Sequence, residues 1–328
     1  MSPIQLHYMK KKTKNILITG ATGLIGSALV KRLVKEDIEL TCPIRNVEKV
    51  KTLFDNDVSN KVNWVETSID SFLKNLSDSY DYIIHCASPT ASKYFVSNPV
   101  ETLSFNITTT TAIMEYAKNH SLKGVLFLSS LESYGMVTEG DILIDEDYQG
   151  YVNPLEVRSS YNIAKRTCEC ICHAYSQEYN VPVKVVRLTQ VISSKVAQED
   201  MRVYAQFARS AARGEDIILH TEGTSARQYL YIDDAVEAII TVLLKGNVGE
   251  AYNVANDETY ISVRKMAEFV QKNFNPEHKV VIQKRDDMGY APVTKLRLCT
   301  QKLRDLGWSP KYGLYEMYYA LINDLKTN

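Results

Sequence analysis

A glycine-rich turn near the start of the chain constrains the fold more than any other sequence feature. The turn reads Thr19-Gly20-Ala21-Thr22-Gly23-Leu24-Ile25-Gly26 and lies between an apolar run at 16–19 and an amphipathic stretch at 24–35. A strand, a glycine turn and a helix in this order are typical of an α/β fold that binds the pyrophosphate of a dinucleotide at the helix N-terminus. A glycine turn with a purely structural role is the alternative interpretation.

Each glycine of the turn has a physical reason under the binding interpretation. Gly20 permits the tight turn, Gly23 lets the backbone approach the pyrophosphate, and Gly26 permits close packing of the helix on the strand. The unpaired N–H groups of the first helical turn then face the anion. The predicted cofactor-binding residues of this segment are Gly20, Thr22, Gly23, Leu24, Ile25 and Gly26.

Alternating strands and helices continue this pattern along the chain. Mostly continuous apolar runs predict buried strands at 16–19, 40–44, 82–86, 125–129 and 183–188, with helices at 24–35 and 99–118. This alternation predicts an α/β fold with a Rossmann-type doubly wound parallel sheet. Beyond about residue 188 the pattern is less regular, with helices predicted near 202–213, 233–244 and 314–325.

The change of pattern suggests a division of the chain into three parts. We expect an N-terminal extension at 1–14 and a dinucleotide-binding Rossmann domain at 15–188. A smaller C-terminal α/β domain at 189–328 is expected to bind the substrate and to be partly interleaved with the first domain.

Charge and hydropathy exclude several classes of partner. Thirty-eight basic and thirty-nine acidic side chains give a formal net charge of −1, so no excess positive charge would hold a nucleic-acid backbone. No window approaches the roughly eighteen apolar residues of a membrane span, and the apolar run at 16–18 is too short for a signal peptide. We therefore expect a cytoplasmic protein without nucleic-acid or membrane partners.

The six cysteines are expected to stay reduced in that compartment. Cys168, Cys170 and Cys172 form a cluster in sequence, but no histidine spacing completes a zinc site with them. No metal site is expected, and we interpret these cysteines as core residues.

The end of the second predicted strand bears on the choice of cofactor. A carboxylate at this place would accept hydrogen bonds from the ribose hydroxyls of NAD. The sequence reads Cys42-Pro43-Ile44-Arg45-Asn46 instead, and the guanidinium of Arg45 suits the 2′-phosphate of NADP. The cofactor is predicted to be NADP or NAD, with NADP slightly favoured, and a solvent-facing arginine is the structural alternative.

A tyrosine and a lysine four residues apart predict catalytic chemistry. Tyr161 and Lys165 share one face of a helix, so the lysine can lower the pKa of the phenol and orient the nicotinamide ribose. The segment Ser129-Ser130-Leu131-Glu132-Ser133-Tyr134-Gly135 follows an earlier parallel strand, at the sheet edge where ligands bind in open α/β folds. The glycine turn, this segment and the Tyr-Lys pair therefore agree with one another.

Together these residues resemble the extended short-chain dehydrogenase/reductase family, and within it the NAD-dependent epimerase/dehydratase group that acts on nucleotide sugars. The resemblance covers nearly the whole chain. Three motifs are most similar to UDP-glucuronate decarboxylases and 4,6-dehydratases: Cys86-Ala87-Ser88-Pro89, Asn98-Pro99 with Asn106, and Asn153-Pro154-Leu155-Glu156-Val157-Arg158. The segment 227–234 resembles the one whose arginine meets the sugar-nucleotide pyrophosphate, and 303–310 resembles the C-terminal signature of the family.

The resemblance implies a role for each matching residue. Tyr161 would exchange the proton of a sugar hydroxyl as hydride moves to or from the nicotinamide, Ser130 would hydrogen-bond the same oxygen, and Lys165 would tune the tyrosine. Glu132 would match the carboxylate that dehydratases and decarboxylases place beside the sugar. The resemblance further implies that Ala87, Asn106, Tyr161 and Lys165 contact the cofactor, and that the substrate site contains Ser88, Arg158, Gln190, Arg227 and Arg297.

The substrate side departs from the family pattern. Arg187 is followed by Leu188-Thr189-Gln190 instead of the usual Asn and Tyr-Gly-Pro, and Asn162-Ile163-Ala164 replaces the acidic-glycine pair of typical decarboxylases. The leading hypothesis is an NAD(P)-dependent enzyme, expected as a homodimer, that oxidises a nucleotide sugar to a 4-keto intermediate. It would then epimerise, dehydrate or decarboxylate that intermediate. The alternatives are an NADP-dependent reductase of a keto-sugar nucleotide or a free aldehyde, and a non-catalytic NADP-sensing scaffold.

Overall fold

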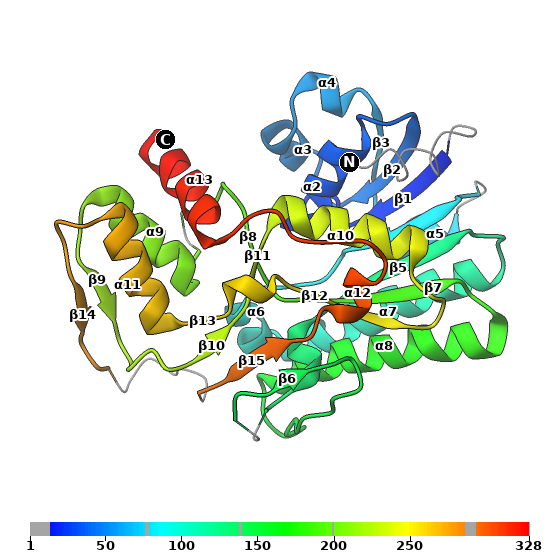
Figure 1. Ribbon diagram of the computed structural model, residues 1–328. Coiled ribbons are helices and arrows are strands. Elements are labelled where there is room, and N and C mark those ends of the chain that lie inside the picture. Colours follow the sequence, from blue (N-terminus) through cyan, green and yellow to red (C-terminus); the bar gives the residue numbers. More distant parts are fainter. Residues whose placement is uncertain (1–13, 76–78, 138–139, 199, 286–292, 328) are drawn as a thin grey trace.

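A seven-stranded parallel sheet forms the centre of the computed structural model, which describes residues 14–75, 79–137, 140–198, 200–285 and 293–327 (Figure 1). The order of its strands confirms the predicted Rossmann-type fold. In spatial order the strands are β12 (Ala251–Val254), β7 (Val183–Leu188), β5 (Gly124–Ser130), β4 (Tyr82–His85), β1 (Lys14–Thr19), β2 (Ile38–Ile44) and β3 (Val62–Glu66).

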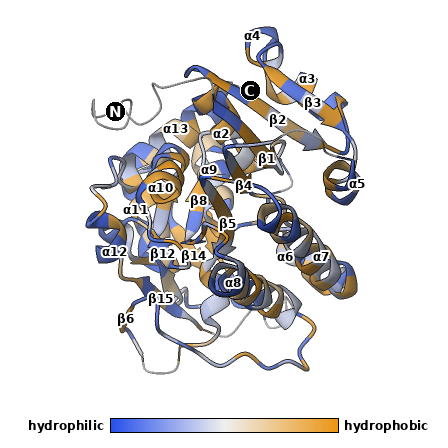
Figure 2. Ribbon diagram, turned by 90° about the vertical axis from the view of Figure 1, so that its right-hand side faces the viewer, coloured by the Kyte–Doolittle hydropathy of each residue, from blue (hydrophilic) through white to orange (hydrophobic). Residues whose placement is uncertain are grey.

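Two layers of helices cover this sheet, as Figure 1 shows. On one face lie α2 (Leu24–Leu33) and α10 (Ile232–Lys245); on the other lie α5 (Ile69–Lys74), α7 (Pro99–Lys118) and α8 (Ser159–Tyr179). Because strand residues alternate between faces, Ile16 and Ile18 pack toward the first layer and Leu17 toward the second. Figure 2 shows α7 and α8 side by side, and these two helices make extensive contact.

Shorter helices lie in the connections of the first half of the chain. They are α3 (Glu48–Leu53), α4 (Asn56–Ser59), α6 (Ser92–Ser97) and the 3-10 helix η1 (Leu131–Tyr134). The η1 turn directly follows β5 at the carboxyl end of the sheet, where parallel α/β folds bind their ligands.

The second half of the chain builds a further helical layer and, together with strand β6 from the first half, three small sheets in the described ranges. The helices α9 (Val203–Arg213), α11 (Val263–Phe274) and α13 (Leu314–Thr327) enclose an apolar core of their own, beside the paired strands β9 (Ile217–Leu219) and β14 (Val280–Ile282). The other strands are β6 (Leu143–Ile144), β8 (Gln190–Ile192), β10 (Ala226–Arg227), β11 (Tyr229–Tyr231), β13 (Ile261–Ser262) and β15 (Lys295–Leu298). The 3-10 helix η2 (Asp257–Thr259) and α12 (Gln301–Arg304) complete this half.

All five predicted strands are present, and two strands of the central sheet were missed. β3 lies at the sheet edge, so its residues are only partly buried and form no continuous apolar run. β12 has only 4 residues and includes the buried polar Asn253. This strand comes from the range expected to form the second domain, whereas the boundary at residue 188 itself remains a prediction.

The structure differs from two predictions, the extent of the N-terminal extension and the burial of the three clustered cysteines. Lys14, placed in the predicted N-terminal extension, is the first residue of β1, and residues 1–13 lie outside the described residues. Cys168 and Cys172 are buried in the core as predicted, but Cys170 is exposed because it lies on the outer face of α8. Within the described ranges, no helix combines the length and apolar character that crossing a membrane requires.

Candidate active site

The glycine turn joins β1 to α2 and leaves the start of that helix uncovered. Gly20 has a φ of +72°, and a Cβ atom there would lie 2.7 Å from the backbone N of Ala87. Gly23 is the N-cap of α2, and its own Cβ would meet only the Gly20 carbonyl oxygen, at 3.3 Å. At Gly26 a Cβ would lie 2.2 Å from that same oxygen. Gly26 therefore packs on the turn itself, which corrects the predicted packing on the strand.

This difference predicts separable effects for two alanine substitutions in the turn. Gly23→Ala is expected to keep the stability of the protein within about 1 kcal/mol, because its Cβ needs only a small shift. The same substitution should weaken dinucleotide binding at least about tenfold, because the new methyl group occupies the approach to the helix N-terminus. Gly26→Ala should weaken dinucleotide binding and should also lower the free energy of unfolding by about 1–3 kcal/mol, because the backbone of Gly20 must move to make room for the new Cβ.

Thermal unfolding and fluorescence titration with NAD and NADP measure the two effects separately. Unchanged dinucleotide affinity in Gly23→Ala would contradict a phosphate-binding role for the turn.

Arg45 lies at the carboxyl end of β2, and the carboxylate of Glu66 lies at the carboxyl end of the neighbouring strand β3. Arg45 is exposed, and its guanidinium lies 5.9 Å from the ring centroid of Phe105. Glu66 pairs in register with Ile44, and its Oε1 accepts a hydrogen bond from the backbone N–H of Val47 at 3.1 Å. The sequence missed Glu66 because β3 was not predicted.

Tyr161 lies on α8 within a cluster of hydroxyl groups. It is 6% exposed, and its hydroxyl is hydrogen-bonded to the hydroxyls of Ser130, at the end of β5, and Ser88, after β4. Its ring stacks on Phe95 of α6 with centroids 4.2 Å apart and an interplanar angle of 5°. The structure therefore brings together three residues that the sequence placed at one site.

Burial determines the ionisation of the Tyr-Lys pair. It raises the pKa of Tyr161, the charge of Glu132 adds to that rise, and the hydrogen bonds to Ser130 and Ser88 oppose it. Burial also lowers the pKa of Lys165 to about 8. The Lys165 ammonium donates to the Leu128 carbonyl at 2.8 Å and lies 5.6 Å from the Tyr161 ring centroid.

The predicted lowering of the tyrosine pKa by Lys165 is therefore wrong for this arrangement. The ammonium points to a backbone carbonyl of β5 instead of the phenol oxygen, and burial of the phenol dominates.

Glu132 is held by groups from the start of α8. Its Oε1 lies 3.3 Å from Nη2 of Arg158, and its Oε2 accepts from Nδ2 of Asn162 at 3.3 Å. The backbone N–H of Glu132 donates to Oγ of Ser130 at 3.2 Å. Arg158, predicted to bind substrate, is thus also an ion-pair partner of the predicted catalytic carboxylate.

Asn106 supports Ser88 from inside the protein. Its Oδ1 accepts from the Ser88 hydroxyl at 2.8 Å, and its Nδ2 donates to the Thr102 carbonyl at 2.7 Å. Each end of this buried amide therefore has a protein partner, which positions Asn106 beneath Ser88, and its contact with the cofactor stays a prediction. Ala87 does line the glycine turn, as its close approach to Gly20 shows.

The two arginines predicted to share a diphosphate lie on neighbouring strands but do not face the same way. Arg227 of β10 pairs in register with Leu296 of β15, so Arg297, one residue further, points to the opposite face. Arg297 is exposed and lies 5.5 Å from the Tyr260 ring. The two guanidinium groups therefore do not lie side by side, Arg227 and Gln190 are half-buried, and the substrate contacts of all three residues stay predictions.

A buried histidine near the glycine turn was also missed. His85 bridges Oγ1 of Thr19, 2.7 Å from its Nδ1, and Oγ1 of Thr110, 3.3 Å from its Nε2. Burial, with a smaller effect of the Lys165 charge, lowers its pKa to about 3, so the ring is neutral at pH 7. A single histidine in an apolar strand gives no sequence signal that separates it from a core residue.

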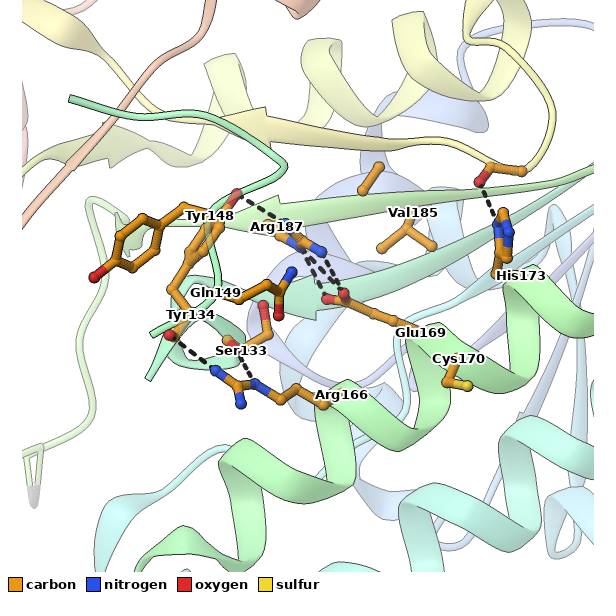
Figure 3. A pocket seen from close by; sticks show the side chains of 12 residues that line it. Ser133, Tyr134, Tyr148, Gln149, Arg166, Glu169, Cys170, His173, Val185 and Arg187 are labelled. Atoms are coloured by element: carbon orange, nitrogen blue, oxygen red, sulfur yellow. Dashed lines mark hydrogen bonds and ion pairs between the residues drawn. The ribbon is translucent and has the colours of Figure 1, made fainter. Parts of the chain in front are cut away.

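Behind the η1 turn, a polar network lines a cavity of about 290 Å³ (Figure 3). Arg187 of β7 forms an ion pair with Glu169 of α8 at 2.7 Å and donates to the Tyr134 hydroxyl at 3.0 Å and the Glu146 carbonyl at 2.7 Å. The Ser129 hydroxyl also donates to Glu169. The network therefore joins β5, η1, β7 and α8 next to the residues that form the site.

Residues 16–255 match the sequence model of the NAD dependent epimerase/dehydratase family. The chain belongs to this family. The match spans the glycine turn, the η1 segment and the Tyr-Lys pair, so it covers every part of the site except Arg297. The resemblance seen in the sequence is confirmed.

Relatives of this epimerase/dehydratase family member include nucleotide-sugar enzymes. It is 29% identical over 325 residues to UDP-glucuronic acid decarboxylase 3 of Arabidopsis thaliana, covering 96% of this chain and 90% of the relative. It is 28% identical to UDP-glucuronic acid decarboxylase 1 of Danio rerio, covering 94% and 71%. The family and these relatives confirm that the chain is an enzyme of nucleotide-sugar epimerase, dehydratase and decarboxylase type, and they favour neither the reductase nor the scaffold.

Solved structures confirm the fold. The UDP-glucose 4-epimerase of Thermotoga maritima, solved with UDP-glucose, gives a TM-score of 0.82 at 22% identity, covering 95% of this chain and 99% of that one. The UDP-glucuronic acid 4-epimerase of Bacillus cereus, solved with UDP-glucuronic acid and NAD, gives 0.76 at 19% identity, with the same coverage.

Proposed function

We propose that this family member oxidises the 4-hydroxyl of UDP-glucuronic acid and decarboxylates the resulting 4-keto acid. The observation that carries the proposal is the cluster in which the Tyr161 hydroxyl contacts Ser130 and Ser88, with Glu132 near enough for its charge to act on the phenol and bound through its backbone N–H to Ser130. The relatives named as UDP-glucuronic acid decarboxylases support the choice of substrate.

The uncovered first turn of α2 fits a dinucleotide, because Gly23 and Leu24 are exposed and Gly23 has no side chain. A bound nicotinamide cofactor supplies a hydride acceptor that later returns the hydride. Burial raises the pKa of Tyr161, so the positive charge of an oxidised nicotinamide would have to favour the phenolate, which accepts the proton of the 4-hydroxyl as the hydride leaves C4. Ser130 holds the same oxygen. The 4-keto group then makes the C5 carboxylate a β-keto acid, which loses CO₂ and leaves an enolate.

Glu132 is assigned to the proton at C5. After CO₂ loss, the enolate must gain one proton at C5, and the protonated carboxyl group of Glu132, near Tyr161, would supply it. Dehydration would instead remove a C5 proton, and 4-epimerisation would leave C5 unchanged. The fate of the C5 proton therefore distinguishes the three outcomes.

Incubation with UDP-glucuronic acid in D₂O tests this proposal by mass spectrometry and NMR. We expect loss of CO₂ and one deuterium at C5 of the product. A product of unchanged mass with its C5 hydrogen retained would show a 4-epimerase, and no turnover of UDP-, CDP-, dTDP- or GDP-sugars would overturn the proposal. Glu132→Gln should still reduce the bound cofactor but stall afterwards, with persistent absorbance of the reduced nicotinamide.

For the cofactor we propose that NADP is accepted slightly better than NAD, because Arg45 offers an exposed guanidinium at the end of β2. Neighbouring structures have been solved with NAD and, for an enzyme of Pseudomonas aeruginosa, with NADPH. Arg45→Asp is expected to change the difference in binding free energy between NADP and NAD by about 1–3 kcal/mol in favour of NAD. The reason is that an ionic contact with the 2′-phosphate is exchanged for repulsion.

Isothermal titration with both dinucleotides checks this expectation, and Arg45→Gln is the control that removes charge without repulsion. If the ratio stays constant in both variants, Arg45 does not contact the 2′-position.

A cytoplasmic homodimer is also part of the proposal, and analytical ultracentrifugation tests its oligomeric state.

A further inference from the structure

Asn162 directly follows the predicted catalytic tyrosine on α8 and hydrogen-bonds Glu132. Its Nδ2 donates to the backbone carbonyl of Glu132 at 2.7 Å and to Oε2 of the same residue at 3.3 Å. Arg158 contacts the other carboxylate oxygen, Oε1, at 3.3 Å. Both oxygens of the carboxylate are therefore held from the beginning of α8, the helix that carries Tyr161.

The chemistry of Asn162 suits this place better than that of an acid. Two acceptor atoms of Glu132 converge on one nitrogen, and only the donor end of an amide can satisfy both. An aspartate at this position would place a second carboxylate against the first, and like charges at this separation do not both ionise freely. The neutral amide therefore holds the Glu132 carboxyl group without adding a second acidic group beside it.

The contacts also link Asn162 to the geometry of the reaction. The backbone of Glu132 is fixed at its carbonyl by Asn162 and at its N–H by the Ser130 hydroxyl, which in turn contacts Tyr161. Tyr161 and Asn162 are consecutive residues of α8, so a single helical turn sets the position of both acid–base groups.

We propose that Asn162 is a positioning residue that orients the Glu132 carboxylate toward the reacting sugar, acting together with Arg158. This inference rests on the proposed function, in which Glu132 handles the C5 proton. Asn162 does not itself touch the substrate in this proposal, and its whole effect on the rate passes through Glu132.

A double-mutant cycle tests this proposal with the nucleotide sugar that the unmodified enzyme converts. Asn162→Ala is expected to lower kcat about tenfold while KM and the dinucleotide dissociation constant change less than about twofold. In the Glu132→Gln background the same substitution should change kcat less than about twofold, because the group it positions is already absent. An equal loss in both backgrounds would overturn the proposal.

The pH profile separates positioning from a purely structural role. Asn162→Asp should move the basic limb of kcat to higher pH, since two adjacent carboxyl groups retain a proton and Glu132 is the proposed proton donor, whereas Asn162→Ala lacks this like-charge effect. Thr167→Ala, further along α8, is the matched control and should leave the profile and kcat unchanged. A basic limb that stays in place in Asn162→Asp contradicts the proposed contact.

A measurement without substrate distinguishes failure of this inference from failure of the proposed function. If no nucleotide sugar is converted, the proposed function fails, but hydrogen exchange followed by mass spectrometry still decides the role of Asn162. Asn162→Ala should speed amide exchange in η1 (Leu131–Tyr134) and leave β12 unchanged at the same melting temperature. Unaltered exchange in η1 would overturn the positioning role.

Discussion

Replacing Tyr161 with phenylalanine is expected to slow the reduction of bound cofactor by a nucleotide sugar by about 10³-fold or more. The hydroxyl is the group that contacts Ser130 and Ser88, and its removal leaves the sugar hydroxyl without the proposed proton acceptor. Phenylalanine keeps the stacking on Phe95, so the fold should be preserved. Stopped-flow absorbance at the reduced nicotinamide band measures the rate after mixing with UDP-glucuronic acid.

The controls for this prediction are the melting temperature and the dinucleotide dissociation constant, both of which should match those of the unmodified enzyme. Lys165→Met offers a contrast, because it removes the ammonium 5.6 Å from the Tyr161 ring while the hydroxyl remains. We expect a smaller loss of rate there. Reduction of the cofactor at the normal rate in Tyr161→Phe would show that another group accepts the proton.

Arg187→Met is expected to lower the free energy of unfolding by about 3–5 kcal/mol. The Glu169 side chain is only 13% exposed and would lose its ion-pair partner, while the Tyr134 hydroxyl and the Glu146 carbonyl would each lose a donor (Figure 3). A buried carboxylate without a counter-ion is more costly than the absence of the whole pair, because the remaining charge stays desolvated.

Urea unfolding monitored by circular dichroism measures the loss. The double variant Arg187→Met/Glu169→Leu is the informative control, since it removes both charges and should recover part of the stability. A loss below about 1 kcal/mol in the single variant would show that solvent reaches Glu169 and replaces the guanidinium.

The parallel sheet could be predicted because most of its strands are short apolar runs separated by helices. The same rule failed for β3, whose edge position leaves only one of its 5 residues fully buried, and for β12, whose polar residue Asn253 interrupts the apolar pattern. Asn253 is tolerated there because its amide donates to the carbonyls of Ile144 and Cys299. Those partners are distant in sequence, so nothing local signals them.

The site was predictable to the extent that it depends on strand ends. Ser130 and Glu132 follow β5, and the carboxyl ends of parallel strands share one edge of the sheet, so their proximity to Tyr161 follows from topology. The direction of each side chain does not follow from topology. For this reason the sequence placed Arg297 with Arg227 in the substrate site, whereas the strand register turns Arg297 away from Arg227.

The position of β12 has a consequence for how the protein emerges from the ribosome. Ala251–Val254 pairs with residues 185–188 of β7, so the sheet of a nascent chain has an open edge until residue 254 has been synthesised. Adding residues 189–254 takes several seconds at a translation rate of about 5–20 residues per second. During that interval β12 and the covering helix α10 are still being synthesised, so the outer edge of β7 is a bare strand that other extended chains can pair with.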